Sequence, residues 1–260
     1  MGNYYYTDGF ASFFDSRYTG WVHTFSPRLA EHLGRQGLPE RSVIDLCCGT
    51  GVTASVFHEA GWQVTGVDGS AAMLDIARKK LAPALDAGAL TLIEADARSF
   101  RTPRRAAACV SMDGALNHLE SVAELTRCFT AVSEALLPGG EFVFDLYEAS
   151  HFRHWNNLTV TDEPDAVIVK RGVWDDGART GMLRVSGVFG TGSSVQRVDQ
   201  TLRSWEYDAA EVAGALESAG LAPAAHDFGA AYVKCDSGSC SLTSVPCRTI
   251  YRARKPLEQG

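Results

Sequence analysis

A glycine-rich turn follows the first apolar run of the chain. Residues 42–47 read Ser-Val-Ile-Asp-Leu-Cys, and residues 49–54, Gly-Thr-Gly-Val-Thr-Ala, then fit the pattern G-x-G-x-x-A. Glycine is needed where the backbone turns sharply into a helix and passes close to a ligand. Nicotinamide and flavin enzymes share this pattern. The turn therefore predicts a bound cofactor without identifying it.

Two acidic residues near this turn narrow the choice of cofactor. Asp68 follows the apolar run 63–67, and a carboxylate there accepts hydrogen bonds from ribose hydroxyls. Asp45 lies four residues before Gly49, at the end of an apolar run. A dinucleotide would bring an anionic pyrophosphate beside this carboxylate, where the two would repel each other. Asp45 therefore indicates a cationic ligand, unless it merely caps the turn.

A third acidic motif, Glu94-Ala95-Asp96-Ala97, follows the apolar run 90–93. A carboxylate at this point can accept a hydrogen bond from an adenine amino group, while a neighbouring amide donates to the ring. S-adenosylmethionine combines an adenosine with a cationic amino group and a sulfonium. The three motifs in this order therefore favour S-adenosylmethionine as the cofactor.

The motifs VIDLCCGTG (43–51), VTGVDGS (64–70), EADA (94–97) and LLPGGEFVFDL (136–146) resemble those of class I S-adenosylmethionine-dependent methyltransferases. The segments GFASFFDSRYTGW (9–21) and MDGALNHL (112–119) narrow the resemblance to small bacterial methyltransferases related to the amino-sugar N-methyltransferases of antibiotic pathways. The resemblance implies methyl transfer to an N or O atom of a small molecule, with a role in bacterial secondary metabolism.

The resemblance also implies a set of cofactor contacts. The methionine end would lie against Asp45 and the glycine turn, the ribose against Asp68, and the adenine against Asp96 and its neighbours, with Tyr18 and Trp21 as a cap. The predicted cofactor-binding residues are Tyr18, Trp21, Asp45, Cys47, Gly49, Gly51, Asp68, Gly69, Met73, Asp96, Ala97 and Met112.

Methyl transfer is an in-line displacement on an activated sulfonium, so the protein mainly aligns the acceptor. A hydroxyl acceptor benefits from a base, whereas a neutral amine needs none that is strong. His118 is the first candidate base, because imidazole titrates near neutral pH, and Asp113 would orient an amine or the histidine. An aromatic-rich group typical of a small-molecule pocket supplies the predicted substrate contacts Asn117, Tyr147, His151, Trp155, Arg203 and Trp205.

Apolar runs alternate with helical patterns from residue 42 to residue 146. This order predicts an α/β fold with a doubly wound, mostly parallel, Rossmann-like sheet. Ser70 and the pair Ser121 and Glu124 are predicted helix caps. Strands are expected at 106–112 and, after the turn Pro138-Gly139-Gly140, at 141–146. Ligands of such sheets lie beyond the carboxyl ends of the strands.

Residues 158–207 show no long helical pattern. Extended segments at 167–174, 182–189 and 195–205 predict a small antiparallel sheet that is inserted as a lid over the substrate site. We expect a helix capped by Asp208 and Glu211 and a last strand at 249–254. The predicted organisation is a helical cap at 1–40, a cofactor-binding domain at 41–157 and 208–256, and the insertion at 158–207.

Composition limits the partners. A net charge of −7, with only short basic clusters such as those at 101–105 and 252–255, argues against a nucleic-acid substrate. No apolar run is long enough to cross a bilayer, and no signal peptide is evident, so we expect a cytoplasmic protein. The seven cysteines lack zinc-site spacing, so we expect free thiols and no metal. The oligomeric state stays open between one chain and a homodimer.

Two other functions remain open at this point. One is a nicotinamide-dependent oxidoreductase, which would share the glycine turn but is disfavoured by Asp45 and the motif at 94–97. The other is a methyltransferase fold that binds the cofactor but catalyses another step, such as cyclisation. Cofactor motifs report binding and not transfer, so they do not separate the second alternative from a methyltransferase.

Overall fold

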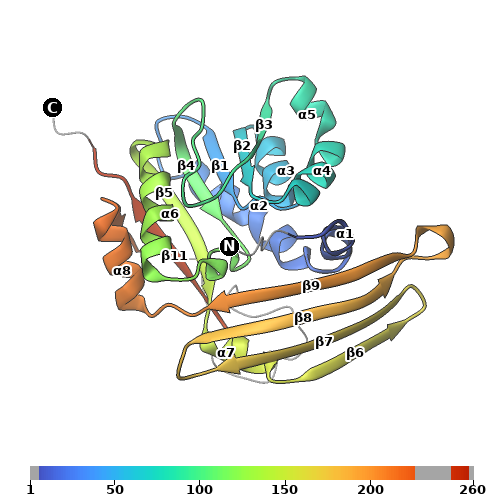
Figure 1. The fold of residues 1–260 in the computed structure, drawn as a ribbon. Helices are drawn as coiled ribbons and strands as arrows, with labels where there is room; N and C mark the ends of the chain where they lie inside the picture. Colours follow the sequence, from blue (N-terminus) through green and yellow to red (C-terminus); the bar gives the residue numbers. More distant parts are fainter. Residues whose placement is uncertain (1–5, 226–246, 258–260) are drawn as a thin grey trace.

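The structure is a computed structural model that describes residues 6–225 and 247–257. Its main sheet has seven strands in the order β10-β11-β5-β4-β1-β2-β3 (Figure 1). Five of these strands are parallel, and β11 and β10 extend the sheet in antiparallel pairing. The predicted doubly wound, mostly parallel fold is confirmed. The strands are β1 Ser42–Leu46, β2 Gln63–Asp68, β3 Leu90–Glu94, β4 Ala106–Ser111, β5 Leu136–Tyr147, β10 Ala222–Pro223 and β11 Arg248–Arg254.

Helices cover both faces of this sheet. On one face, a buried cluster joins α2 and α3 to side chains such as Val43 and Val64, and on the other face α6 and α8 cover Ile44 and Phe142. All five residues of β1 are buried, because both of its faces are covered. The helices are α2 Gly20–Gly34, α3 Val52–Glu59, α4 Ala71–Lys80, α5 Ala82–Asp86, α6 Val122–Ala135 and α8 Ala209–Ser218.

The predicted helix caps are present. The Ser70 hydroxyl accepts a hydrogen bond from the Met73 amide at 3.3 Å at the start of α4. Ser121 caps α6 in the same way, and Asp208 and Glu211 form a complete capping box on α8. These caps satisfy amides that the first helical turn leaves without partners. They fix where the helices begin at the pocket end of the sheet.

Strand β5 begins at Leu136, five residues earlier than the predicted start at Glu141. The turn residues Pro138 to Gly140 lie within it because the pairing with β4 is irregular between Ala106 and Ala108. A Cβ on Gly140 would lie 3.0 Å from the carbonyl oxygen of Ala107. Glycine therefore lets β5 pass close to β4 where a turn was expected.

The insertion forms a separate four-stranded antiparallel sheet in the order β6-β7-β8-β9. In Figure 1 it lies below the main sheet, and β9 leads into α8. Helix α1, Asp8–Arg17, packs on it through Phe10 and Phe13, which contact Ile168 and Val198 in one buried cluster. Its first strand was not predicted, because none of its side chains is buried. The strands are β6 Leu158–Glu163, β7 Ala166–Asp175, β8 Thr180–Phe189 and β9 Gln196–Trp205.

Candidate functional site

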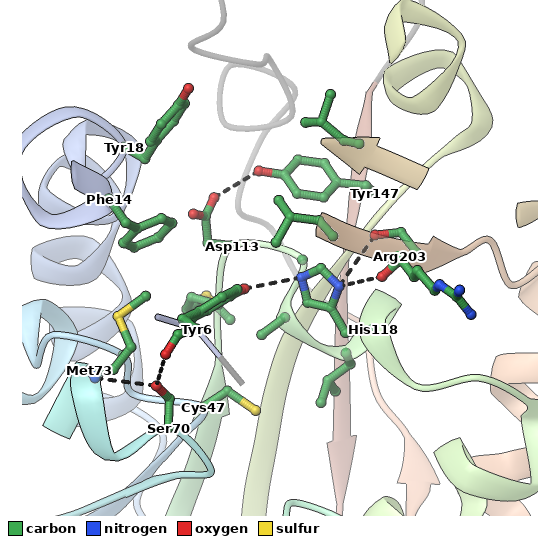
Figure 2. A pocket seen from close by; sticks show the side chains of 18 of the residues that line it. Tyr6, Phe14, Tyr18, Cys47, Ser70, Met73, Asp113, His118, Tyr147 and Arg203 are labelled. Carbon is green, nitrogen blue, oxygen red and sulfur yellow. Dashed lines mark hydrogen bonds between the residues drawn. The ribbon is translucent and has the colours of Figure 1, made fainter. Parts of the chain in front are cut away.

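A pocket of about 970 Å³ opens at the carboxyl ends of the parallel strands. Its walls come from the loops after β1, β2, β3, β4 and β5, from α1 and the start of α2, and from the second sheet (Figure 2). Every predicted site residue lines it except Gly51 and Asn117. The predicted residues that do line it are Tyr18, Trp21, Asp45, Cys47, Gly49, Asp68, Gly69, Met73, Asp96, Ala97, Met112, Asp113, His118, Tyr147, His151, Trp155, Arg203 and Trp205.

The carboxylate of Asp45 lies at one end of this pocket and is 2% exposed. Its Oδ2 atom has no hydrogen-bond partner among the described residues. Burial raises the pKa of Asp45, a backbone hydrogen bond at Ala54 lowers it, and the charge of Asp68 raises it; together they bring the pKa to about 8. A buried carboxylate oxygen without a partner is costly. A cationic amino group would satisfy it, so this end of the pocket fits the methionine end of S-adenosylmethionine.

Asp68 holds the glycine turn in place. The amide of Gly49 donates to its Oδ2 atom and the amide of Ser70 to its Oδ1 atom, each at 2.8 Å. Burial nevertheless raises the pKa of Asp68. A carboxylate oxygen accepts two hydrogen bonds, so each oxygen keeps a lone pair that suits a ribose hydroxyl.

Gly51 has a structural role instead of the predicted contact with the cofactor. It adopts a left-handed φ of 82° before α3, and a Cβ there would lie 2.8 Å from Cδ1 of Leu81. The structure therefore gives Gly51 the roles of turning the chain and allowing α3 to approach the end of α4. It does not line the pocket.

Asp96 is paired with Arg98, a pocket residue that was not predicted. The Nε atom of Arg98 donates to Oδ1 of Asp96 at 2.8 Å and its Nη2 to Oδ2 at 2.5 Å, while its Nη1 donates to Oε1 of Glu124 at 2.7 Å. These bonds lower the pKa of Asp96. The carboxylate therefore stays ionised at neutral pH and can still accept from an adenine amino group.

His118 also lines the pocket, in the short helix η1 (Ala115–His118) after β4. Its Nδ1 atom lies 2.6 Å from the carbonyl oxygen of Arg203. Since a carbonyl only accepts, Nδ1 carries the proton. Burial lowers the pKa of His118, so the ring is neutral and its Nε2 has a lone pair. Figure 2 shows that the Tyr6 hydroxyl, 3.3 Å from Nε2, faces this atom.

Asp113 belongs to a buried network that includes Arg248. The Tyr147 hydroxyl donates to Oδ1 of Asp113 at 2.8 Å, and Nη2 of Arg248 donates to that hydroxyl at 2.8 Å. Nη1 of Arg248 donates to Oδ2 of Asp145 at 2.9 Å. Burial raises the pKa of Asp145 to about 6, against the charge of Arg248. Two carboxyl groups, those of Asp113 and Asp145, therefore lie against one guanidinium.

The guanidinium of Arg248 also packs against two aromatic rings in the wall of the pocket. It lies 3.5 Å from the ring centroid of Trp21 and 4.6 Å from that of Tyr147. The ring of His151 stacks on Tyr147, with centroids 3.8 Å apart. Burial, with the charge of Arg248, lowers the pKa of His151 to about 3. The wall is therefore a stack of flat groups with a neutral imidazole at its end.

Asn117 is a correction to the predicted substrate contacts. Its Nδ2 atom donates to the carbonyl oxygens of Tyr147 and Trp205 at 3.2 Å and 2.8 Å, and its Oδ1 accepts from the Tyr147 amide at 2.8 Å. The residue is fully buried outside the pocket lining. Its amide side chain therefore joins the ends of β5 and β9 and has no atom facing a substrate.

Several pocket residues were not predicted. Tyr6, Phe10 and Phe14 come from the N-terminal segment and α1, and Lys170 on β7 lies 4.6 Å over the ring of Tyr18. Arg98 stands two residues after Asp96, a local signal that could have been used. Tyr6 and Arg248 give no such signal, because their partners lie more than 100 residues away in sequence.

The remaining expectations concern metals, membranes and thiols. Within residues 6–225 and 247–257, no cluster of potential metal ligands occurs. No helix in the same ranges is long and apolar enough to span a bilayer. Cys47, Cys48, Cys109 and Cys128 are free thiols, as expected. Cys247 is disulfide-bonded, so the expectation of free thiols is wrong there; Cys235 and Cys240 lie outside the described residues.

Comparison with known proteins agrees with this geometry. Residues 43–140 match the family model described as a methyltransferase domain. The chain is 35% identical over 114 residues to the dTDP-3-amino-3,4,6-trideoxy-alpha-D-glucopyranose N,N-dimethyltransferase of Streptomyces venezuelae. The match covers 44% of this chain and 46% of that enzyme. The chain is 30% identical over 123 residues to the dTDP-3-amino-3,6-dideoxy-alpha-D-glucopyranose N,N-dimethyltransferase of Streptomyces fradiae, covering 47% of this chain and 46% of that enzyme.

The matches to these two enzymes span about half of their length, and they bear out the resemblance to amino-sugar N-methyltransferases. The proteins named here are methyltransferases and not oxidoreductases. Among solved structures, an S-adenosylmethionine-dependent methyltransferase from Clostridium acetobutylicum has a TM-score of 0.79 at 20% identity, covering 95% of this chain and 98% of that one. Residues 43–140 therefore resemble a methyltransferase domain, and the chain has the fold of the class I methyltransferases.

Proposed function

We propose that this protein methylates an amino group of a small molecule, with S-adenosylmethionine as the methyl donor. The observation that carries the proposal is the buried Oδ2 atom of Asp45, a pocket-lining residue near the glycine turn; this atom has no partner among the described residues. The pyrophosphate of a dinucleotide would repel the Asp45 carboxylate, whereas the ammonium group of the donor would pair with it. When bound, S-adenosylmethionine supplies a methyl group already activated on a sulfonium.

The residues proposed to hold the donor follow the pocket wall. Asp45 and Gly49 would bind the methionine end, Asp68 the ribose, and Asp96 with Ala97 the adenine edge. Met73 is fully buried and lies in the pocket wall at the first turn of α4, where it would pack on the adenosine. Tyr18 and Trp21 would close the pocket from the N-terminal side.

The acceptor is proposed to lie between His118 and the Asp113 network. The two Streptomyces relatives are named as N,N-dimethyltransferases of dTDP-amino sugars, so an amino sugar attached to a nucleotide is the first acceptor to test. The acceptor nitrogen would form its new bond to the methyl carbon as the bond between that carbon and the donor sulfur breaks. The nitrogen would become cationic, and the sulfur would leave as a neutral thioether. Nε2 of the neutral His118 would then accept the proton from that nitrogen, while Asp113 would orient it.

The second sheet is proposed to act as the lid that the sequence predicts. Leu183 and Val185 of β8 and Leu202 and Ser204 of β9 line the pocket opposite the main sheet. A roof of this kind leaves room for a small molecule and excludes bulk water, which strengthens the electrostatic contacts inside. It fits a metabolite better than a nucleic acid. A cytoplasmic location stays our prediction, and the oligomeric state stays open between one chain and a homodimer.

Isothermal titration followed by a transfer assay tests the proposal. S-adenosylmethionine and S-adenosylhomocysteine should both bind, and NAD should not. With labelled S-adenosylmethionine and dTDP-amino sugars, label should appear in the sugar. Binding of NAD with no response to S-adenosylmethionine would overturn the cofactor assignment. Cofactor binding without transfer to any amine would instead favour the non-transferring alternative.

A further inference from the structure

The carboxylate of Asp96 is held by both the backbone and the side chain of Arg98. The backbone amide and the Nε atom of Arg98 each donate to Oδ1 of Asp96 at 2.8 Å. Nη2 of Arg98 donates to Oδ2, and Nε makes only a longer contact of 3.1 Å with that oxygen. A carboxylate oxygen accepts two hydrogen bonds, so Oδ1 is fully used and Oδ2 keeps one lone pair. Asp96 therefore offers a ligand a single acceptor position.

The guanidinium of Arg98 also fixes the direction of that acceptor. Nε and Nη2 meet the two carboxylate oxygens as a planar fork, so the pairing sets the plane of the carboxylate. The Asp96 side chain cannot turn without breaking at least one of these bonds. The remaining lone pair of Oδ2 therefore keeps one orientation before any ligand binds.

Arg98 is itself held in place by Glu124 at the start of α6. Its Nη1 atom donates to Oε1 of Glu124 at 2.7 Å. The other oxygen, Oε2, accepts from the Glu120 amide at 2.9 Å. Each guanidinium nitrogen of Arg98 thus has a carboxylate partner, and the residue joins the loop after β3 to α6. Arg98 is therefore placed to act on a ligand through Asp96.

A hydrogen-bond donor follows this acceptor in the chain. Ala97 lines the pocket, and within residues 6–225 and 247–257 its backbone amide donates to no other group. A fixed acceptor and an open donor on consecutive residues form a pair that can recognise the edge of a base. A 6-aminopurine presents the complementary pair, because its N6 donates and its N1 accepts. A 6-oxopurine presents the opposite pair, because its O6 accepts and its N1 donates.

We propose that Arg98 is a positioning residue that makes this part of the pocket select a 6-aminopurine and reject a 6-oxopurine. The inference rests on the proposed function, because it takes the base of the methyl donor to lie against Asp96 and Ala97. A 6-aminopurine then makes both hydrogen bonds. A 6-oxopurine sets O6 against the carboxylate and its N1 hydrogen against the Ala97 amide, so it loses both.

The positive charge of Arg98 removes another way in which a 6-oxopurine could bind. A protonated carboxyl group can donate a hydrogen bond to O6, whereas an ionised one only accepts. Hydrogen bonds from Arg98 lower the pKa of Asp96, against the effect of burial. Asp96 therefore stays ionised at neutral pH and is an acceptor only.

Isothermal titration of the full chain with S-adenosylhomocysteine and its 6-oxo analogue, S-inosylhomocysteine, tests the proposal near neutral pH. The wild type should bind S-adenosylhomocysteine about a hundredfold more tightly, the usual effect of losing a hydrogen bond to a charged group. In Arg98→Met the carboxylate of Asp96 is free to turn toward water. The ratio of the two affinities should therefore fall to roughly tenfold or less.

Arg127→Met is the matched control. Nη2 of Arg127 donates to the same Oε1 of Glu124 at 3.2 Å but not to Asp96, so this variant should keep the wild-type ratio. Asp96→Asn should lower the ratio by itself, because it removes the charged acceptor. Adding Arg98→Met to Asp96→Asn should then lower the ratio no further, because Arg98 acts through Asp96.

The outcomes separate selection of the base from a structural role. The Arg98 side chain is 35% exposed, so Arg98→Met should fold. If it does not, Arg98→Lys keeps one of the two fork bonds and should give an intermediate ratio. Equal weakening of both ligands in these variants would overturn the inference, and so would a wild type that binds both ligands equally tightly. A wild type that binds neither ligand would overturn the proposed function and the inference with it.

Discussion

The hydroxyl of Tyr6 lies 3.3 Å from Nε2 of His118, the ring atom that is free to accept a proton. The Tyr6 carbonyl accepts from the Ser70 hydroxyl at 3.3 Å, and the Thr7 amide donates to Gln200 at 3.1 Å. Tyr6 therefore joins the start of α4 to His118, and Thr7 continues the segment to β9. The phenol occupies the position where an acceptor N–H would meet the histidine, so an acceptor bound as proposed would have to displace it.

Replacing Tyr6 with Phe should lower the KM for the acceptor. The variant keeps the ring and removes the hydrogen bond that competes for Nε2 of His118. A neutral hydrogen bond contributes about 1 kcal/mol, so KM should fall by roughly fivefold. Steady-state kinetics at saturating S-adenosylmethionine measures the change. A rise in KM would mean that the phenol binds the acceptor instead of competing with it.

Replacing His118 with Gln should slow turnover. Loss of a positioned proton acceptor costs roughly 10²–10⁴ in rate. Burial lowers the pKa of His118, so wild-type kcat should fall only when the pH drops below the ordinary histidine range. The variant should lose this acid limb while it binds S-adenosylhomocysteine normally. An unchanged pH profile would show that His118 takes no proton.

Replacing Asp45 with Asn should abolish the release of a proton that is expected when the donor binds to the wild type. The pKa of Asp45 is about 8 without ligand, so its carboxyl is mostly protonated at pH 7. A bound ammonium favours the ionised form, so wild-type affinity should rise as the pH rises toward 8. Titration at pH 7 in two buffers of different ionisation heat counts the protons. A release of nearly one proton is expected for the wild type and none for Asp45→Asn.

Replacing Arg248 with Met should destabilise the fold. It leaves Asp145 fully buried and Asp113 mostly buried without their counter-charge. Removing one partner of a buried ion pair costs about 3–5 kcal/mol of unfolding free energy. Urea denaturation measures the loss. Adding Asp145→Asn to this variant should recover part of it, because the uncompensated charge is gone. Equal stability of the single and double variants would contradict an electrostatic cause.

Sequence alone determined the order of strands and helices and several residues of the pocket wall around the glycine turn. Hydrophobic periodicity and helix caps act over a few residues, so they are readable without the fold. The same holds for Asp45, Gly49, Asp68 and Asp96, because each directly follows or ends an apolar run in a short motif. Strand β6 could not be predicted in this way, because none of its side chains is buried and it has no alternation of buried and exposed positions.

Tertiary structure decided the acceptor end. Arg248 meets Asp145 across 103 residues and Asp113 across 135, and Tyr6 meets His118 across 112. No local pattern encodes such a contact, because it depends on which strands become neighbours in the sheet. The same reason explains Asn117, whose residue type suits a substrate contact. Only the folded structure, in which the ends of β5 and β9 both lie beside Asn117, shows that its side-chain amide bonds to backbone groups of Tyr147 and Trp205.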